Sequence, residues 1–271
     1  MSSHLYRQLT WSETRTAAER GAIIVIPVAA IEQHGHHLPV DVDNLLVEHV
    51  TEEAARRSEG LILVVPMIHY GFNEHNMGFP GTVSIRESVF MDFCYDVAHS
   101  FVRQGFDRIM FINGHGSNQM LLNLVARRVV NTTKALAASV AHWSLAAEAA
   151  QKLRESKFPG GMAHACEFET SIYMHLRPDL VKTDLIPQRE IPSVMNEFLY
   201  EDLFGAGPVH MVERWSRITE TGVEGDANLA TPEKGKEFAE CSIRKLIEFA
   251  RFFRDYQSPP DRDFNYRNPA L

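Results

Sequence analysis

The sequence is poor in cysteine, and the cysteines it has show no spacing typical of a disulfide framework. There are three in 271 residues, Cys94, Cys166 and Cys241, which lie far apart and form no C-x-x-C pair. An odd number of well-separated cysteines argues against both a disulfide scaffold and a cysteine-based zinc site.

Excess positive charge and long apolar runs are also absent. The formal net charge is −8 at pH 7, which argues against a surface for nucleic acid or for anionic membranes. No apolar run approaches the roughly 20 residues that cross a bilayer, and the first residues lack the charged-then-apolar pattern of a signal peptide. We therefore expect a soluble, cytoplasmic protein that acts on a small molecule, without nucleic-acid or membrane partners.

Short apolar runs alternate with segments of helical periodicity. Continuous apolar runs indicate strands buried on both faces, as in a parallel sheet covered by helices. The predicted strands cover residues 21–29, 61–68, 108–113 and 135–143. The predicted helices cover residues 44–58, 88–105, 118–133 and 232–254.

This alternation predicts an α/β fold with a mostly parallel central sheet. Residues 171–176 begin a helix or a strand, residues 186–230 have few periodic signals, and the tail from Ser258 onward reads as extended. Because there is no internal repeat or evident linker, we expect one domain over residues 1–271.

The stretch EQHGHHLPVDVD (32–43) follows the first predicted strand. If the chain there is extended, Glu32 and His34 point to the same side, at the strand end where α/β proteins bind ligands. Asp43 begins the next helix, so a helix N-cap is the alternative to a ligand role. His36 and His37 are interpreted first as polar loop residues.

A second polar turn, INGHGSN (112–118), follows the third predicted strand. Its glycines allow the backbone to bend and to bring His115 inward. The turn matches neither a dinucleotide-binding fingerprint nor a nucleophile elbow. A purely structural histidine is the alternative.

The third cluster, HACEFETS (164–171), contains His164, Glu167 and Glu169. In a helix His164 and Glu167 would share a face, whereas in a strand Glu167 and Glu169 would. A solvated helix start is the alternative. Cys166 beside His164 could be a thiol nucleophile, but that spacing is a weak signal and cysteine is usually a buried small residue.

Together these clusters supply Glu, His, Asp, His and Glu side chains, a set that suits two divalent cations. Imidazole favours Zn and carboxylate favours harder ions such as Mn. Asp43 is the natural bridge between the two ions. Two metal ions about 3.5–4 Å apart can activate a water molecule and polarise a carbonyl group.

The motifs resemble those of the creatininase (creatinine amidohydrolase) family. The resemblance covers PVAAIEQHGHHLPVDVDN (27–44), YGFNEHNMGFPGTVSI (70–85), INGHGSN, HACEFETS and TGVEGDANLATPEKGKEF (221–238). It implies a three-layer α/β/α fold, a dinuclear metal site, hydrolysis of amide bonds that are often cyclic, and a homo-oligomer, commonly a hexamer.

Carried over by position, the resemblance gives a role to each residue of the motifs. Glu32 and His115 would hold one metal, His34 the other, and Asp43 would bridge them. His164 would move protons as general acid toward the leaving group.

The sequence departs from creatininase in two places. Ser117 stands where creatininase carries a metal-binding Glu, so we assign Glu167 as the compensating ligand near the catalytic centre and Glu169 as a group that orients a ligand. Creatininase also carries a tryptophan and an acidic residue just before the later histidine, where this chain has residues 161–163, GMA. The substrate pocket is therefore expected to differ.

Four further polar residues are expected to face the substrate, because loops at strand ends often carry function. They are Glu74, His75, Ser117 and Asn118. A structural loop is the alternative for residues 70–82, whose Pro80-Gly81 turn needs only backbone chemistry.

The resulting hypothesis is a dinuclear metal-dependent hydrolase in which a metal-bound hydroxide attacks a small, preferably cyclic, amide. Within the same resemblance the substrate could instead be a formamide, a peptide bond near a chain end, or a cyclic polyol ketone opened by C–C hydrolysis. Two alternatives of other kinds are a non-catalytic metal- or ligand-binding protein and an enzyme that uses Cys166 as nucleophile.

Overall fold

A four-stranded, wholly parallel sheet forms the centre of the computed structural model, which describes residues 3–188, 195–260 and 262. The strand order is β2-β1-β3-β4. The strands are β1 (Ile23–Val28), β2 (Ile62–Val64), β3 (Arg108–Asn113) and β4 (Leu136–Ala141). Most of the tail predicted to be extended, residues 261 and 263–271, lies outside the described residues.

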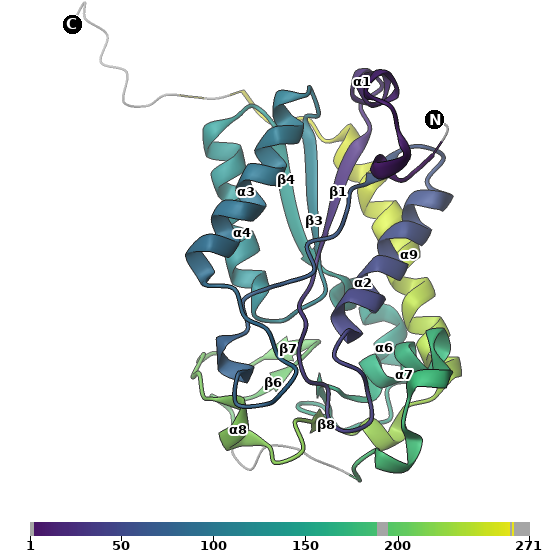
Figure 1. Ribbon diagram of the computed structural model, residues 1–271, viewed down its shortest axis with the longest axis vertical. Helices are drawn as coiled ribbons and strands as arrows, with labels where there is room; N and C mark the ends of the chain where they lie inside the picture. Colours follow the sequence, from purple (N-terminus) through teal and green to yellow (C-terminus); the bar gives the residue numbers. More distant parts are fainter. Residues whose placement is uncertain (1–2, 189–194, 261, 263–271) are drawn as a thin grey trace, which may run out of the picture.

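Helices cover both faces of this sheet (Figure 1). One layer holds α3 (Glu87–Arg103) and α4 (Asn118–Thr132), and the other holds α2 (Val42–Arg57) and α9 (Pro232–Asp255). Ile24 and Ile26 of β1 belong to the apolar cluster with the α3–α4 layer, whereas Ile23 and Val25 belong to that with α2 and α9. The predicted three-layer α/β/α fold is confirmed.

Burial on both faces explains why β1 reads as an unbroken apolar run. Residues 23–26 are fully buried, and each such side chain contributes about 1.5–3 kcal/mol by leaving water. The second predicted strand, 61–68, is shorter than expected. β2 ends at Val64, two residues before Pro66, which has no N–H to donate to a neighbouring strand.

The long helix α9 begins with a favourable sequence for a helix N-terminus. The Thr231 hydroxyl accepts a hydrogen bond from the backbone N–H of Lys234, and Pro232 occupies the first turn. Both features stabilise a helix start, because they satisfy or remove donors that have no partner within the helix. α9 packs against α7 (Glu167–Leu176), so residues 171–176 are helical.

The remaining elements are short, and most of those after residue 160 gather beyond the carboxyl ends of the strands (Figure 1). The pair β5 (Met162–His164) and β8 (Glu224–Gly225) is antiparallel, as is the pair β6 (Glu201–Asp202) and β7 (Gly205–Ala206). The short helices are α1 (Trp11–Glu19), α5 (His142–Leu145), α6 (Ala147–Leu153) and α8 (Trp215–Ile218). The single 3-10 turns are η1 (Tyr6–Gln8), η2 (Glu74–Asn76), η3 (Pro178–Leu180), η4 (Thr183–Leu185) and η5 (Ala227–Leu229).

None of the helices in the described ranges combines the length and the hydropathy that a membrane crossing requires.

Candidate metal centre

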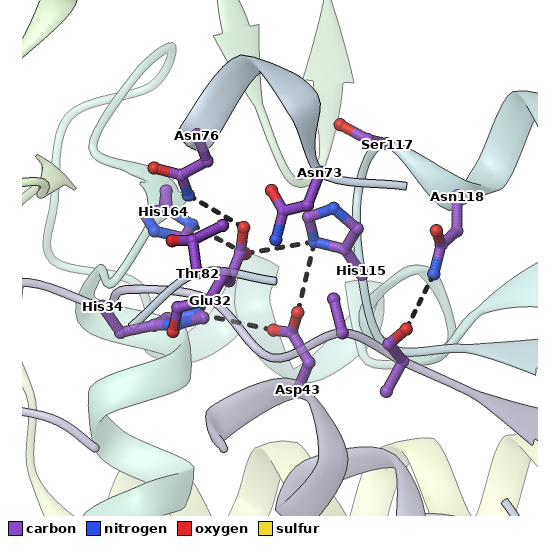
Figure 2. A network of polar contacts seen from close by, with 12 residues as sticks. Glu32, His34, Asp43, Asn73, Asn76, Thr82, His115, Ser117, Asn118 and His164 are labelled. Atoms are coloured by element: carbon purple, nitrogen blue, oxygen red, sulfur yellow. Dashed lines mark hydrogen bonds and ion pairs between the residues drawn. The ribbon is translucent and has the colours of Figure 1, made fainter. Parts of the chain in front are cut away.

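A cluster of buried carboxylates and imidazoles lies at the carboxyl ends of β1 and β3 (Figure 2). Glu32 and His34 follow β1, and His115 follows β3. Asp43 comes from the first turn of α2 and Glu169 from the first turn of α7. Residues far apart in the sequence thus meet because parallel strands end at the same edge of the sheet.

Asp43 lies between the two histidines of the cluster. Its Oδ1 is 3.3 Å from Nε2 of His34, and its Oδ2 is 3.2 Å from Nδ1 of His115. Asp43 is the second residue of α2, whose N-cap is Asp41, so it is not the cap of this helix. Its two oxygens are therefore available to two different partners.

Three overlapping groups of side chains could each hold a metal ion. Within each group the ligand atoms lie within 4.8 Å of one another. The groups are Glu32–Asp43–His115, His34–Asp43–Glu169 and Glu32–His34–His164. The first two share only Asp43.

The electrostatics of the cluster indicate a site for positive charge. Burial opposes a charge on His34, but the nearby carboxylates of Asp43 and Glu169 outweigh it and raise the pKa of His34 well above its ordinary value. Burial likewise opposes a charge on His115, yet Glu32 and Asp43 raise its pKa to about 10. The buried carboxylates therefore retain protons on neighbouring imidazoles.

The donor set fits divalent cations. His34 Nε2 and Asp43 Oδ2 are buried and make no well-aligned hydrogen bond, which is costly unless another partner satisfies them. A cation that replaced the two imidazole protons would balance the same carboxylates.

His164 borders the cluster, but its pKa is shifted in the opposite direction from those of His34 and His115. Its Nε2 donates to the backbone oxygen of Gln33 at 2.8 Å, and its Nδ1 lies 3.5 Å from Oε1 of Glu32. Burial and the nearby His34 lower the pKa of His164. A neutral ring with an unprotonated Nδ1 facing the cluster can accept a proton there.

The prediction that Glu167 joins the cluster is wrong. Its Oε1 accepts a hydrogen bond from Lys234 Nζ at 2.7 Å, and its two oxygens also accept from the backbone N–H groups of Glu155 and Ser156. The carboxylate that reaches the cluster is Glu169, whose Oε1 lies 3.9 Å from His34 Nε2.

The error comes from the position at which α7 begins. A continuous helix would place His164 and Glu167 on one face, but His164 lies in β5 and the helix starts only at Glu167. Residues two apart in a helix point in nearly opposite directions, so only one of Glu167 and Glu169 can face the metal-capable cluster.

The four residues expected to face the substrate occupy different positions. His75 stacks on His115 with ring centres 6.1 Å apart, and the Ser117 hydroxyl lies 3.4 Å from both His75 ring nitrogens. Asn118 instead joins two loops, donating to Ala29 O and accepting from the N–H of Phe72. Glu74 is exposed.

Several residues around the cluster were given no individual role by the sequence. Gln33 and Asn76 are buried amides that hydrogen-bond to each other, and both polar side-chain atoms of buried Asn73, drawn beside His115 in Figure 2, make no hydrogen bond. The Trp215 ring lies edge-on to His164 and to His75, at 5.1 and 5.8 Å between centres. Single amides and single aromatic rings in loops have no distinctive spacing, so the sequence alone could not identify them.

Cys166 lacks the environment of a nucleophile. The side chain is buried, and burial followed by the charge of Glu169 raises the pKa of its thiol well above the ordinary value. The reactive form of cysteine is the thiolate, so the structure does not support a Cys166 enzyme.

The fold and the cluster together define an α/β protein with a metal-capable site at the carboxyl ends of its strands. The creatininase family profile, described as creatinine amidohydrolase, matches residues 7–250. The chain belongs to the creatininase family.

Characterised relatives have more than one activity. The chain is 28% identical over 259 residues to the creatinine amidohydrolase of Pseudomonas putida, covering 90% of this chain and 95% of that protein. It is 27% identical over 264 residues to the 3-dehydro-scyllo-inosose hydrolase of Thermotoga maritima, covering 91% and 82%. It is 31% identical over 237 residues to the mycofactocin precursor peptide peptidase of Mycobacterium ulcerans, covering 84% and 85%.

Solved creatininase structures have the same fold. A crystal structure of creatinine amidohydrolase superposes with a TM-score of 0.79 at 25% identity, covering 95% of this chain and all of that one. A structure described as creatininase with Mn gives a TM-score of 0.78 at 26% identity, covering 94% of this chain and 100% of that one. These likenesses establish a creatininase-family hydrolase.

Proposed function

We propose that this protein is a dinuclear metal-dependent hydrolase that cleaves the C–N bond of a small, preferably cyclic, amide. The observation that supports two ions rather than one is the position of Asp43. Each of its oxygens faces a different histidine, at 3.3 and 3.2 Å, so Asp43 would supply one oxygen to each of two metal sites.

The proposed ligand sets follow from this geometry. Glu32, Asp43 and His115 would hold one ion, and His34, Asp43 and Glu169 would hold the other. Each set mixes imidazole with carboxylates, a combination compatible with Zn and with Mn. Divalent ions bound there would supply Lewis-acid polarisation of a carbonyl and activation of water.

We assign the proton transfer to His164. Because its Nε2 is held by Gln33 O, the ring presents Nδ1 to the cluster. A neutral imidazole at this position can accept a proton when water attacks and deliver it to the departing nitrogen. His75, Ser117 and Trp215 surround the same region and would orient the substrate and exclude bulk water.

The substrate pocket is proposed to differ from that of creatininase. A Cβ at Gly161 would lie 2.6 Å from the backbone oxygen of Lys157 and from Ser156 Cβ, so this position cannot hold the larger side chain expected from creatininase. An amide other than creatinine is therefore the proposed substrate. The peptidase activity of a relative that is 31% identical also supports C–N cleavage.

The proposal is tested with protein purified without chelator. We expect about two equivalents of Zn or Mn per chain and hydrolysis of at least one compound in a panel of cyclic ureides, lactams, formamides and short peptides. Asp43→Asn, which weakens both ligand sets, is expected to lose most of the metal and the activity. Protein without bound metal, or activity that persists after chelation, would overturn the proposal.

The same panel, with a cyclic polyol ketone added, separates the alternatives. Turnover of a cyclic polyol ketone alone would favour C–C hydrolysis, and one relative is a 3-dehydro-scyllo-inosose hydrolase. Two bound metals with no turnover of any compound would favour a binding protein. We also propose a homo-oligomer, a hexamer in particular, which light scattering on the purified protein would test.

A further inference from the structure

The two carboxylate oxygens of Glu32 have different surroundings. Oε1 faces the histidines, at 3.1 Å from His115 Nδ1 and 3.5 Å from His164 Nδ1. Oε2 points away from them and accepts a hydrogen bond from Asn76 Nδ2 at 2.9 Å (Figure 2). Only Oε1 is thus directed toward the metal-capable groups.

The orientation of the Asn76 amide is determined by a second buried amide. Asn76 Oδ1 accepts from Gln33 Nε2 at 3.2 Å. If the Asn76 amide were reversed, its oxygen would face the Glu32 carboxylate and its nitrogen would face another donor. Both are unfavourable in a buried site, so Asn76 presents its N–H to Glu32.

Gln33 is in turn held by backbone groups, whose donor and acceptor roles cannot change. Its Nε2 also donates to Gly222 O at 3.0 Å, and its Oε1 accepts from the N–H of Gly35 at 2.9 Å. Trp215 Nε1 donates to the same Gly222 oxygen at 3.0 Å. A Cβ at residue 222 would collide with the Gln33 amide, and its φ of +90° favours glycine.

We propose that Asn76 is a positioning residue that reserves Oε1 of Glu32 for metal, with Gln33 and the Gly222 backbone as its support. The inference rests on the proposed function, because it takes Glu32 as a ligand. A carboxylate can bind a cation through one oxygen or through both. Here the hydrogen bond from Asn76 makes Glu32 a one-oxygen ligand and fixes its rotamer.

The position of Asn76 predicts an effect on one metal site rather than on both. Its side chain contacts Glu32 and Gln33, whereas the His34–Asp43–Glu169 group does not include Glu32. Loss of the Asn76 amide should therefore weaken the Glu32–Asp43–His115 site selectively. A general loosening of the fold would weaken both.

The test is calorimetric titration of chelator-treated protein with Zn²⁺ or Mn²⁺. For Asn76→Ala we expect about a 10–100-fold lower affinity at one of two sites, the usual effect of losing a group that orients a ligand, and little change at the other. Asn76→Leu, which has about the same size but no amide donor, should be about as severe. His34→Ala removes a ligand of the His34–Asp43–Glu169 site and leaves the Glu32–Asp43–His115 site. Adding Asn76→Ala to this variant should therefore weaken the one site that still binds metal.

Asn44→Ala is the matched control. Asn44 is also buried and its amide donates to a backbone oxygen, Ala30 O at 3.0 Å, rather than to a carboxylate. We expect it to lower the thermal midpoint about as much as Asn76→Ala does and to leave both metal affinities unchanged.

Equal weakening of both sites by Asn76→Ala, or wild-type affinities in Asn76→Leu, would overturn the inference while leaving the dinuclear function standing. A wild-type protein that binds no divalent metal would overturn the proposed function and the inference with it.

Discussion

Lys234 and Glu167 form a buried ion pair, with Nζ 2.7 Å from Oε1, that joins the first turn of α9 to the first turn of α7. Lys234 also donates to Leu229 O and lies 2.7 Å from Oε1 of Glu155. Glu167 therefore stabilises the junction of the two helices. This junction fixes the start of α7 and so determines the direction in which the same turn presents Glu169.

The two glutamates of α7 should respond differently to the same substitution. Glu169→Gln is expected to lose about one of two metal equivalents and to stay folded, because a neutral amide is a poorer ligand. Glu167→Gln should keep both metals but lose about 2 kcal/mol of unfolding free energy, since a charged hydrogen bond is removed. Metal analysis and urea unfolding of the metal-free proteins measure the two effects. Loss of one metal equivalent in Glu167→Gln, with both metals kept in Glu169→Gln, would instead identify Glu167 as the ligand.

Metal binding should release protons. In the metal-free protein the carboxylates raise the pKa of His34 well above its usual value and that of His115 to about 10. Both imidazoles are therefore protonated at pH 7, and an imidazole must lose that proton before it can bind a metal. We expect at least one proton released per chain on loading, and weaker binding as the pH falls. Calorimetry in two buffers of different ionisation enthalpy counts the protons, and a count of zero would contradict this charge assignment.

Glu224 should make the fold less stable as the pH rises. Burial, followed by the charges of Glu201 and Asp202, raises its pKa from 4.5 to about 8, and its Oε2 has no hydrogen-bond partner. Asp202 is paired with Arg154, whose guanidinium nitrogen lies 2.6 Å from it. Between pH 4.5 and 8 the unfolded chain releases this proton while the folded chain retains it, so stability falls by up to about 1.4 kcal/mol for each pH unit.

Glu224→Gln removes this titration. Urea unfolding of both proteins from pH 5 to 8.5 should show that the unfolding free energy of the variant increases relative to that of the wild type as the pH rises. A stability difference that stays constant with pH would show that Glu224 titrates normally in the folded protein.

Cys166→Ala should leave hydrolysis within about two-fold of the wild type, because the buried thiol remains protonated and cannot act as the nucleophile. The native thiol should also react slowly with an alkylating reagent. A loss of activity beyond about 100-fold in a folded, metal-loaded variant would point back to cysteine catalysis.

The layers of the fold can be inferred from the sequence alone. The unbroken apolar run that becomes β1 requires burial on both faces, and the helical periodicity between the runs supplies the covering layers. The sequence also indicated Glu32, His34 and His115 as candidate metal ligands, since each follows a strand and parallel strands end at one edge of the sheet. These inferences need only local periodicity and the order of elements along the chain.

Three-dimensional packing was needed to learn which later carboxylate faces the site and what holds Glu32 in place. The choice between Glu167 and Glu169 depends on the residue at which α7 begins and on the location of Lys234, 67 residues further along the chain. The roles of Asn76 and Trp215 depend on loops that meet across the site. Side-chain direction at a helix start and contacts between distant loops arise from packing, which no local pattern in the sequence encodes.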